Sequence, residues 1–397
     1  MIDINALIML LAYSALIYLA TTTIILFNNR KHIGGVIEQG SPTKNKYTRG
    51  RKISICIPAR NEELTIEQCV SSACQQTYAH CEVLVLDDES DDDTPEKLSA
   101  LKKQFPEILT IYKGKKKPEH WLGKNWACHQ LFSKSNGNIV VFIDADTFLD
   151  NHFANKVVDT LLRENLDFAT VWPQQQMKSF WEKLLIPMVY HTLLSTLPAH
   201  YVSQKPWWIP SKLARKTAPL FVAACGQCMI FERKAYIECG GHEQVKNEIV
   251  EDVAIAKNIK RAGLHMKMYH GLKSITCRMY HSEPEIRNGF RKNFLAGFGY
   301  NIPLFLAVSL LHWIVFIFPY IWVLVAIITS NYYLVTVALM CCILIYIQRF
   351  YIDMWFDWQK TYSILHPVGV FWYQYLAVLT LADYIGNRTV TWKERAT

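Results

Sequence analysis

The sequence lacks the cysteine arrangements that would staple a small secreted domain or hold a zinc ion. Its 11 cysteines are odd in number and follow no regular spacing. Cys225 and Cys228 have the C-x-x-C spacing, but no second pair and no histidine stand at zinc-ligand spacing from them. We therefore interpret them as small buried residues and expect reduced thiols in a domain that faces the cytosol.

Internal repeats and low-complexity stretches are also absent, and charge is limited. Charged residues make up 19% of the chain and hydrophobic residues 51%, so the sequence is neither wholly soluble nor wholly membrane-embedded. The formal charge of +8 would suit nucleic acid or an anionic membrane surface. Residues 53–282 contain no groove pattern of basic and aromatic residues. We therefore expect no nucleic-acid partner and a protein that meets a membrane.

A long apolar run opens the chain. Ile4–Phe27 carries no charge and is long enough to cross a hydrocarbon core of about 30 Å. No charged segment precedes it and no small-residue cleavage site follows, which predicts a retained transmembrane anchor over residues 1–28. The linker over residues 29–52 holds seven Lys or Arg against the single acid Glu38. The positive-inside rule places this linker in the cytoplasm, beside anionic lipid headgroups.

Apolar runs return after residue 300, and we expect membrane segments over residues 301–385. Ile302–Ile328 and Tyr332–Ile347 are typical of spanning helices, and His366–Ile385 is a third run that contains Asp383. Three crossings there would place the basic tail, residues 386–397, outside. A re-entrant or interfacial last segment would keep the tail inside, and the sequence leaves both readings open.

Two further segments have the character of membrane-interface elements. Residues 283–300 form a basic amphipathic stretch just before the apolar runs, and a solvated helix end would look the same. Phe180–Lys212 is rich in tryptophan and proline. It could be a lid that touches the membrane or the core of an aromatic subdomain.

Strand and helix patterns alternate over residues 53–282. Ile53–Pro58, Glu82–Asp88 and Ile108–Tyr112 have strand patterns, and a helix is expected to begin near Asp93, where a proline lies in the first turn. The alternation predicts an α/β fold with a doubly wound sheet. In such sheets ligands bind beyond the carboxyl ends of the strands.

Two carboxylates one residue apart follow the most apolar of these strand patterns. Ile139–Ile143 is a fully apolar run typical of a buried strand, and Asp144 and Asp146 come directly after it. Hard oxygen ligands at a strand end are a natural seat for Mg²⁺ or Mn²⁺ carrying substrate phosphates. A lone D-x-D is more often an acidic turn. Its meaning therefore depends on the surrounding motifs.

Two polar segments follow the first two strands. Pro58–Glu63 is a proline-led turn that could frame a base, with Asn61 and Glu62 offering polar groups to a base or ribose. Asp87–Thr94 is rich in acids, and a carboxylate there could accept from uracil N–H or from ribose hydroxyls. Taken singly, the first could be a surface turn and the second a favourable helix start.

Two more segments bring a cation and a candidate base. Lys124 follows a glycine ahead of a helix, where its ammonium and the helix N-terminus could bind diphosphate oxygens. Glu251 and Asp252 begin a helix that continues to Gly263, and a carboxylate there could act as general base toward an acceptor hydroxyl. Alone, the two acids are more often only a favourable helix start.

In this order the motifs resemble the family 2 glycosyltransferases of the GT-A fold. The finer resemblance is to the membrane-bound branch that glycosylates lipids: the carotenoid-acid (diaponeurosporenoate) and hopanoid-associated enzymes, with ceramide glucosyltransferases more distant. The segments that carry the family resemblance are Pro58–Glu63, Asp87–Thr94, Trp121–Lys124, Asp144–Asp146, Gly226 with Gly240 and Gly241, and Glu251–Asp252. The finer match rests on Trp121–Cys128, Arg278–Tyr280, Gly289–Asn293 and Val390–Lys393.

The resemblance implies a role for each matching residue. Pro58, Ala59, Asn61, Glu62 and Asp88 would hold the nucleotide of a UDP-sugar. Asp144 and Asp146 would bind Mg²⁺ or Mn²⁺ on the diphosphate, assisted by Lys124. Asp252, beside Glu251, would be the base of an inverting transfer. Acceptor or interface roles are implied for Gly226, Gln227, Arg278 and Arg291.

We thus expect a GT-A catalytic domain over residues 53–282 in a multi-pass cell-membrane protein, with the domain in the cytoplasm. Its reaction would move a sugar, with UDP-hexose as the expected donor, to a lipid such as a carotenoid, another terpenoid or a sphingolipid. The Q-x-x-R-W motif of processive synthases is absent, which argues against polymer formation. A polyprenyl-phosphate sugar synthase and a non-catalytic membrane scaffold are the alternatives.

Overall fold

The structure, a computed structural model, describes residues 4–35, 50–386, 388, 391–392 and 395–396. Most of the predicted basic linker and half of the predicted tail lie outside the described residues. The chain divides into two compact units, which we call the helical unit and the sheet unit. The helical unit comprises Met1–Lys31, Met177–Pro198 and Tyr280–Thr397, and the sheet unit comprises His32–Gln176 and Ala199–Met279.

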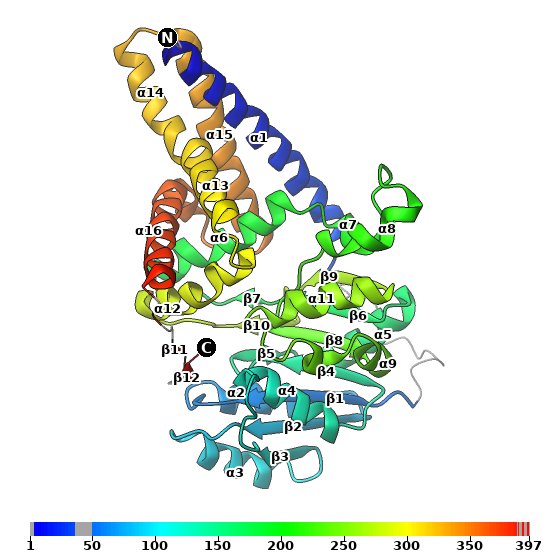
Figure 1. Cartoon of the computed structure of the whole chain (residues 1–397). Coiled ribbons are helices and arrows are strands. Elements are labelled where there is room, and N and C mark those ends of the chain that lie inside the picture. The colour runs from blue at the N-terminus through cyan, green and yellow to red at the C-terminus, as the bar shows by residue number, and fades with distance from the viewer. Residues whose placement is uncertain (1–3, 36–49, 387, 389–390, 393–394, 397) are drawn as a thin grey trace. The chain divides into compact units, whose positions relative to one another are not determined.

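Seven strands of the sheet unit form one mixed sheet among the described residues, in the order β3-β2-β1-β4-β8-β6-β9 (Figure 1). Strands β1, β2, β3 and β4 run parallel to one another, whereas β8 runs antiparallel to both of its neighbours, β4 and β6. The predicted α/β fold class is confirmed. The strands are β1 (Ile53–Ala59), β2 (Cys81–Asp87), β3 (Leu109–Lys113), β4 (Ile139–Ile143), β6 (Phe168–Trp172), β8 (Cys228–Glu232) and β9 (Met266–His270).

A second, three-stranded sheet joins segments that are distant in sequence. In it β10 (Ile275–Cys277) lies between β5 (Thr147–Leu149) and β7 (Gln174–Gln175). Strand β5 begins one residue after Asp146, so this small sheet fixes the chain just beyond the predicted metal ligands.

The helices of the sheet unit follow the predicted alternation with the strands. Helix α3 begins directly after Asp93 with a proline in its first turn, as the sequence indicates. Helix α11 begins at Glu251 and is closed by Gly263 in the left-handed conformation. The helices are α2 (Ile66–Cys74), α3 (Thr94–Gln104), α4 (Gly123–Lys134), α5 (Phe153–Glu164), α7 (His200–Ser203), α8 (Ser211–Thr217), η1 (Ala218–Leu220), α9 (Arg233–Glu238), α10 (Gly241–Gln244) and α11 (Glu251–Ala262).

The core of the sheet unit is built by the central strands. Strand β4 is buried at all five positions, and β1 at six of seven. Such strands lie inside a sheet covered on both faces, which explains why their sequences are apolar without alternation. The polar residues that follow each strand are therefore confined to the strand ends.

Among its described residues, the helical unit contains four helices long and apolar enough to cross a membrane: Ile4–His32, Ile302–Ile328, Tyr332–Trp355 and Lys360–Ile385. The run predicted as Tyr332–Ile347 thus extends eight residues further. A π-helical turn interrupts Ile302–Ile328 at η3. The elements are α1 (Ile4–His32), α6 (Phe180–Thr196), α12 (Glu283–Phe294), η2 (Ala296–Phe298), α13 (Ile302–His312), η3 (Trp313–Ile317), α14 (Phe318–Ile328), α15 (Tyr332–Trp355), η4 (Lys360–Leu365), α16 (His366–Ile385), β11 (Thr391–Trp392) and β12 (Arg395–Ala396).

A buried arginine donates to a backbone carbonyl that a proline inside α6 cannot bond. Pro187 lies inside α6 and has no N–H to bond the carbonyl of Lys183. Nη2 of Arg349 donates to that carbonyl at 2.9 Å, and its Nε bonds both oxygens of Asp353. The charge of Arg349 is thus paired with Asp353, and its N–H donors have partners within the helices, as a buried ion pair requires.

Candidate active site

The predicted site residues lie where neighbouring parallel strands end. Asp144 follows β4, the turn that includes Asn61 follows β1, and Asp88 follows β2. Because β1 pairs with both β2 and β4 in parallel, all three carboxyl ends meet at one edge of the sheet. This is the edge where ligands bind in open α/β sheets.

Lys124 joins two acidic segments at this edge. Its Nζ lies 2.8 Å from Oδ1 of Asp144 and 2.9 Å from Oε1 of Glu251. The neighbouring acid, Asp252, accepts a hydrogen bond at Oδ2 from the backbone N–H of Gly226 at 2.9 Å. The structure therefore brings together five residues that lie as much as 128 positions apart in sequence.

Lys124, Glu251 and Asp252 lie so close to residue 226 that this position requires a glycine. A Cβ at this position would lie 3.2 Å from both Oε1 of Glu251 and Nζ of Lys124, and 3.6 Å from Oδ2 of Asp252. A side chain here would enter the space between the lysine and the two acids. The glycine is therefore part of the site's shape as well as a donor to Asp252.

Burial and charge give the acids of α11 different protonation behaviour. Burial, reinforced by the charge of Glu251, raises the pKa of Asp252 to about 7. Burial would also raise the pKa of Glu251, but the adjacent Lys124 holds it below its ordinary value. Burial opposes the charge of Lys124, yet the carboxylates of Asp144 and Glu251 keep its pKa well above the usual value. Asp252 is thus the acid suited to exchange a proton near neutral pH.

Asn125 is a site residue whose contacts are not evident from the sequence. Its side chain is buried, and Nδ2 donates to the carbonyls of Val245, Lys246 and Glu248 at 2.9, 3.3 and 3.0 Å. These bonds clamp the loop before α11 to the first turn of α4. The clamp holds the lysine of one segment against the acids of the other.

Asp146 contacts neighbouring residues of the small sheet. The thiol of Cys277 hydrogen-bonds its side chain, and Oγ1 of Thr147 donates to its Oδ1 at 3.3 Å. The N–H of Arg278 donates to the backbone carbonyl of Asp146 at 3.4 Å. Arg278, predicted as an acceptor or interface residue, therefore also borders the predicted metal seat through its backbone.

Gln227 is buried behind the acids. Its Nε2 donates to Sγ of Cys277 at 2.9 Å, and its Oε1 accepts from Nε2 of Gln175 at 2.9 Å. Only 4% of the residue is exposed. The structure thus places Gln227 in a chain of polar contacts that supports Asp146, although we expected it at the acceptor or interface.

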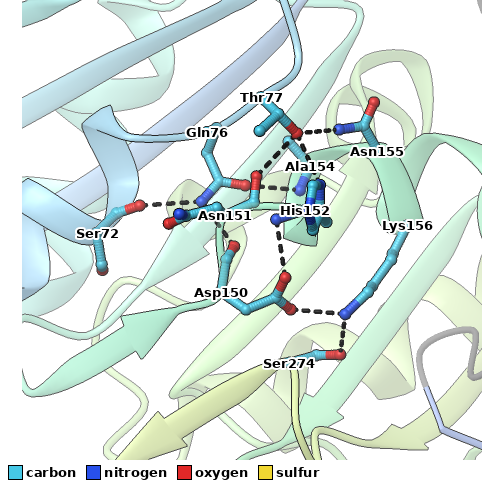
Figure 2. Close-up of polar contacts among 10 residues, drawn as sticks. All are labelled: Ser72, Gln76, Thr77, Asp150, Asn151, His152, Ala154, Asn155, Lys156 and Ser274. Atoms are coloured by element: carbon cyan, nitrogen blue, oxygen red, sulfur yellow. Dashed lines mark hydrogen bonds and ion pairs between the residues drawn. The ribbon is translucent and has the colours of Figure 1, made fainter. Parts of the chain in front are cut away.

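The segment after Asp146 is anchored by an extended polar network (Figure 2). Nε2 of Gln76 donates to the carbonyl of Asp150 at 2.9 Å, while its Oε1 accepts from the N–H of Ala154. The carboxylate of Asp150 pairs with Nζ of Lys156 at 2.7 Å, and Lys156 also bonds Ser274. The turn beyond β5 is therefore fixed to α2 and α5, which restrains the strand end that carries the two acids.

The predicted nucleotide residues are joined by bonds between the ends of β1 and β2. The N–H of Asp88 donates to the carbonyl of Ala59 at 2.8 Å. Asn61, in the left-handed conformation, accepts at Oδ1 from the N–H of Asp91, and the N–H of Glu62 donates to Oγ1 of Thr94. These bonds shape a turn after β1, and Pro58 lies half-buried near the end of that strand.

Arg291 lies on α12 of the helical unit, outside the cluster in the sheet unit. Its guanidinium makes a two-point ion pair with Asp383 of α16. This contact is internal to the helical unit and gives Arg291 a structural partner.

Comparison with known proteins finds one family model that matches part of the chain. Residues 54–240 match the model described as Glycosyl transferase family 2. The chain is 25% identical over 232 residues to the 4,4'-diaponeurosporenoate glycosyltransferase of Staphylococcus haemolyticus, covering 58% of this chain and 57% of that protein. It is also 25% identical over 283 residues to the protein of the same name from Staphylococcus aureus (strain N315), covering 69% and 67%. The chain thus spans a little over half to two thirds of these relatives' lengths.

A solved structure supports the fold assignment. A mannosyltransferase from Pyrobaculum calidifontis, in complex with GDP-Man and Mn²⁺, superposes with a TM-score of 0.53. The superposition covers 96% of this chain and 99% of that one at 13% identity. At this identity the likeness concerns the fold alone, which is that of a GT-A glycosyltransferase.

Proposed function

We propose, from the premise that this chain carries a family 2 glycosyltransferase domain, that it transfers a hexose from UDP-hexose to a lipid acceptor with inversion. The observation that carries the proposal is the convergence of Asp144, Lys124, Glu251 and Asp252 around Gly226. A strand-end acid, a cation and a half-buried base are the groups that a single displacement of a nucleoside diphosphate needs.

Asp144 and Asp146 would hold a divalent cation. No group of three or more His, Cys, Asp or Glu side chains is assembled for a metal in the part of the chain that the structure describes. Two carboxylates completed by substrate phosphates are the usual arrangement for Mg²⁺ in phosphate sites. The lysine ammonium 2.8 Å from Asp144 supports the fit, because this carboxylate already accommodates a cation. When bound, the metal would stabilise the departing UDP, and the fold neighbour's complex with GDP-Man and Mn²⁺ agrees with this role.

Asp252 would act as the general base. Its raised pKa suits proton transfer near neutral pH, and the Gly226 N–H fixes one of its oxygens. The other residues have supporting roles: Lys124 would meet diphosphate oxygens, and the negative charge of Glu251 raises the proton affinity of its neighbour. Pro58, Ala59, Asn61, Glu62 and Asp88 would hold the nucleoside.

A lipid acceptor is supported by two findings. Four helices are long and apolar enough to cross a membrane, and the curated relatives are named for a carotenoid acid. Purified protein should transfer labelled sugar from UDP-glucose to a carotenoid acid, another terpenoid or a ceramide. Transfer to polyprenyl phosphate alone would overturn the acceptor class, and no transfer to any acceptor would favour a non-catalytic scaffold.

The helical unit supports an arrangement in which Ile4–His32, Ile302–Ile328 and Tyr332–Trp355 cross the membrane, α16 does not, and the tail stays on the cytoplasmic side. Helix α16 lies antiparallel along the first half of Ile302–Ile328: the rings of His366 and Phe316 are 5.4 Å apart, Gln374 bonds Ser309, and Asp383 pairs with Arg291. A crossing α16 would separate Asp383 from the helix just before the span. We infer that α16 is re-entrant in the cell membrane.

This arrangement also satisfies the positive-inside rule, because the basic linker and the basic tail share one side. A membrane-impermeant thiol reagent should label a cysteine added at the tail end only after the cells are permeabilised. Labelling of intact cells would contradict the arrangement.

A further inference from the structure

The segment from Lys205 to Leu220 exposes large apolar side chains in the sheet unit. Trp207 is 85% exposed, Leu220 74%, Trp208 54% and Leu213 49%. Helices α8 and η1, which carry the two leucines, contain no buried residue. We call this segment the 205–220 surface. Exposed apolar side chains that gather in one segment and are rimmed by polar residues usually mark a contact surface.

The same surface is strongly cationic. Lys205, Lys212, Arg215 and Lys216 lie within it and are exposed. The chain has no Asp or Glu between Glu182 and Glu232, so no acid of this stretch offsets these cations. Tryptophan and leucine side chains rimmed by cations are the composition of elements that lie in the headgroup region of an anionic membrane.

The 205–220 surface is fixed to the helix that carries the proposed base. Nε of Arg215, within the surface, donates to the carbonyl of Arg261 at 2.8 Å, and Nζ of Lys260 donates at 2.7 Å to the carbonyl of Val202, three residues before the surface begins. Both contacts involve the last turn of α11, which contains Lys260 and Arg261.

An aromatic cluster stiffens the base of the surface. Tyr201 packs on Trp208 and Phe221, with ring centroids 6.5 and 5.5 Å apart, and Trp208 and Phe221 are 6.1 Å apart. Trp207, the neighbour of Trp208, remains outside this cluster. The packed rings of Tyr201, Trp208 and Phe221 thus lie beside Trp207, whose own side chain is left exposed.

We propose that the 205–220 surface is a membrane-contact surface, which inserts Trp207, Leu213 and Leu220 into the headgroup region of an anionic leaflet. The cations would meet lipid phosphates, while the aliphatic side chains would enter the acyl boundary. Aliphatic groups distinguish this surface from a nucleic-acid site, where aromatic side chains stack on bases. Because the surface is mounted on α11, contact with lipid would also set the position of Asp252 at the bilayer.

The direct test is a depth measurement in lipid nanodiscs. The full chain would carry a nitroxide at Trp207→Cys, and Cys81 and Cys342, the two cysteines that are not buried, would be replaced. The matched control is Leu64→Cys, an 80% exposed apolar position of the sheet unit that follows Glu62 and Glu63. In discs with anionic lipid, the label at 207 should be more accessible to oxygen than to a water-soluble nickel complex, and the label at 64 should show the reverse. Water-like accessibility at both positions would overturn the proposal.

A charge-reversal pair supplies an independent readout. Lys212→Glu with Lys216→Glu should move the label at 207 toward water in anionic discs, whereas Lys103→Glu, an exposed cation of α3, should leave it in place. In discs of neutral lipid, the label at 207 of the protein without charge reversal should also move toward water, since the attraction to anionic lipid is lost. An unchanged depth after charge reversal would also contradict the proposal. None of these readouts depends on transferase activity, so they stand apart from the proposed reaction.

Discussion

The backbone N–H of Gly226 donates to Oδ2 of Asp252 at 2.9 Å, and the same glycine leaves room for Lys124 beside Glu251. One small residue thus orients the proposed base and keeps the space in front of it open. Its position just before β8 connects the central sheet to the first turn of α11.

Gly226→Ala should inactivate the enzyme without unfolding it. The added Cβ would lie 3.2 Å from two charged side chains, which must shift by a few tenths of an ångström or more. Misplacement of catalytic groups by about 1 Å can cost on the order of 100-fold in rate. Steady-state transfer rates and thermal unfolding would measure the two effects. Gly297→Ala, where nothing lies within 4 Å, is the control that should retain activity; equal rates for both variants would contradict the assigned role.

Asp252→Asn should reduce transfer to a hydroxyl acceptor by about 10²–10⁴-fold while UDP binding is kept. The wild-type rate should fall as the pH drops through about 7, because the base must be ionised and its pKa is raised to about 7. Initial rates across neutral pH and UDP titration would check both. A carboxylate acceptor, already ionised at neutral pH, would make the substitution mild, so the variant also reports on the acceptor.

The same substitution has a stability signature of defined sign. A carboxyl whose pKa is raised on folding stabilises the fold below its unfolded pKa, and this contribution is lost as the pH rises through the folded value. Asn carries no charge at neutral pH. Asp252→Asn should therefore unfold at the same or a higher temperature than wild type at neutral pH. A marked fall would show that loss of activity reflects damage to the fold.

Asp146→Asn should abolish turnover through loss of the divalent cation. Mn²⁺ binding in the presence of UDP, followed by electron paramagnetic resonance, should be lost in the variant and kept in Asp91→Asn, an exposed acid of the loop after β2. Chelation of the metal should stop the wild-type enzyme, and added Mn²⁺ or Mg²⁺ should restore it. Wild-type Mn²⁺ affinity in Asp146→Asn would refute its role as ligand.

Asn125→Ala should loosen the loop that leads to α11. Its amide serves three carbonyls in the interior, and leaving buried polar groups unpaired costs about 1–3 kcal/mol of the free energy of unfolding. Transfer should slow because Lys124 and Glu251 lose their common support. Denaturant unfolding and transfer rates would be compared with Ser133→Ala, an exposed position of the same helix. A stable, fully active Asn125→Ala protein would rule out the clamp.

Local pattern was sufficient to predict much of the fold. The apolar runs at Ile53 and Ile139 became buried strands because only a sheet covered on both faces can hold them. The antiparallel insertion of β8 between β4 and β6 could not be read in the same way, since its pairing joins residues far apart in sequence.

In the candidate site, too, some residues could be predicted from local pattern and others could not. The acids lie just after recognisable strands or at the start of a helix, so their types and spacing carry information. Gln227 and Asn125 are defined by partners elsewhere in the chain: Cys277 and Gln175 for the first, and the loop before α11 for the second. Nothing in the neighbouring sequence distinguishes an amide that faces a ligand from one that supports a carboxylate from behind.

Mass spectrometry of lipid extracts tests the central claim most directly. Extracts would be compared from cells that contain the wild-type protein, cells that contain the Asp252→Asn protein and cells that contain neither. We expect a lipid heavier by one hexose in extracts from cells with the wild-type protein and none in extracts from cells without it. In cells with the Asp252→Asn protein, this lipid should be strongly reduced when the acceptor is a hydroxyl. Identical lipid profiles in cells with and without the wild-type protein would contradict it.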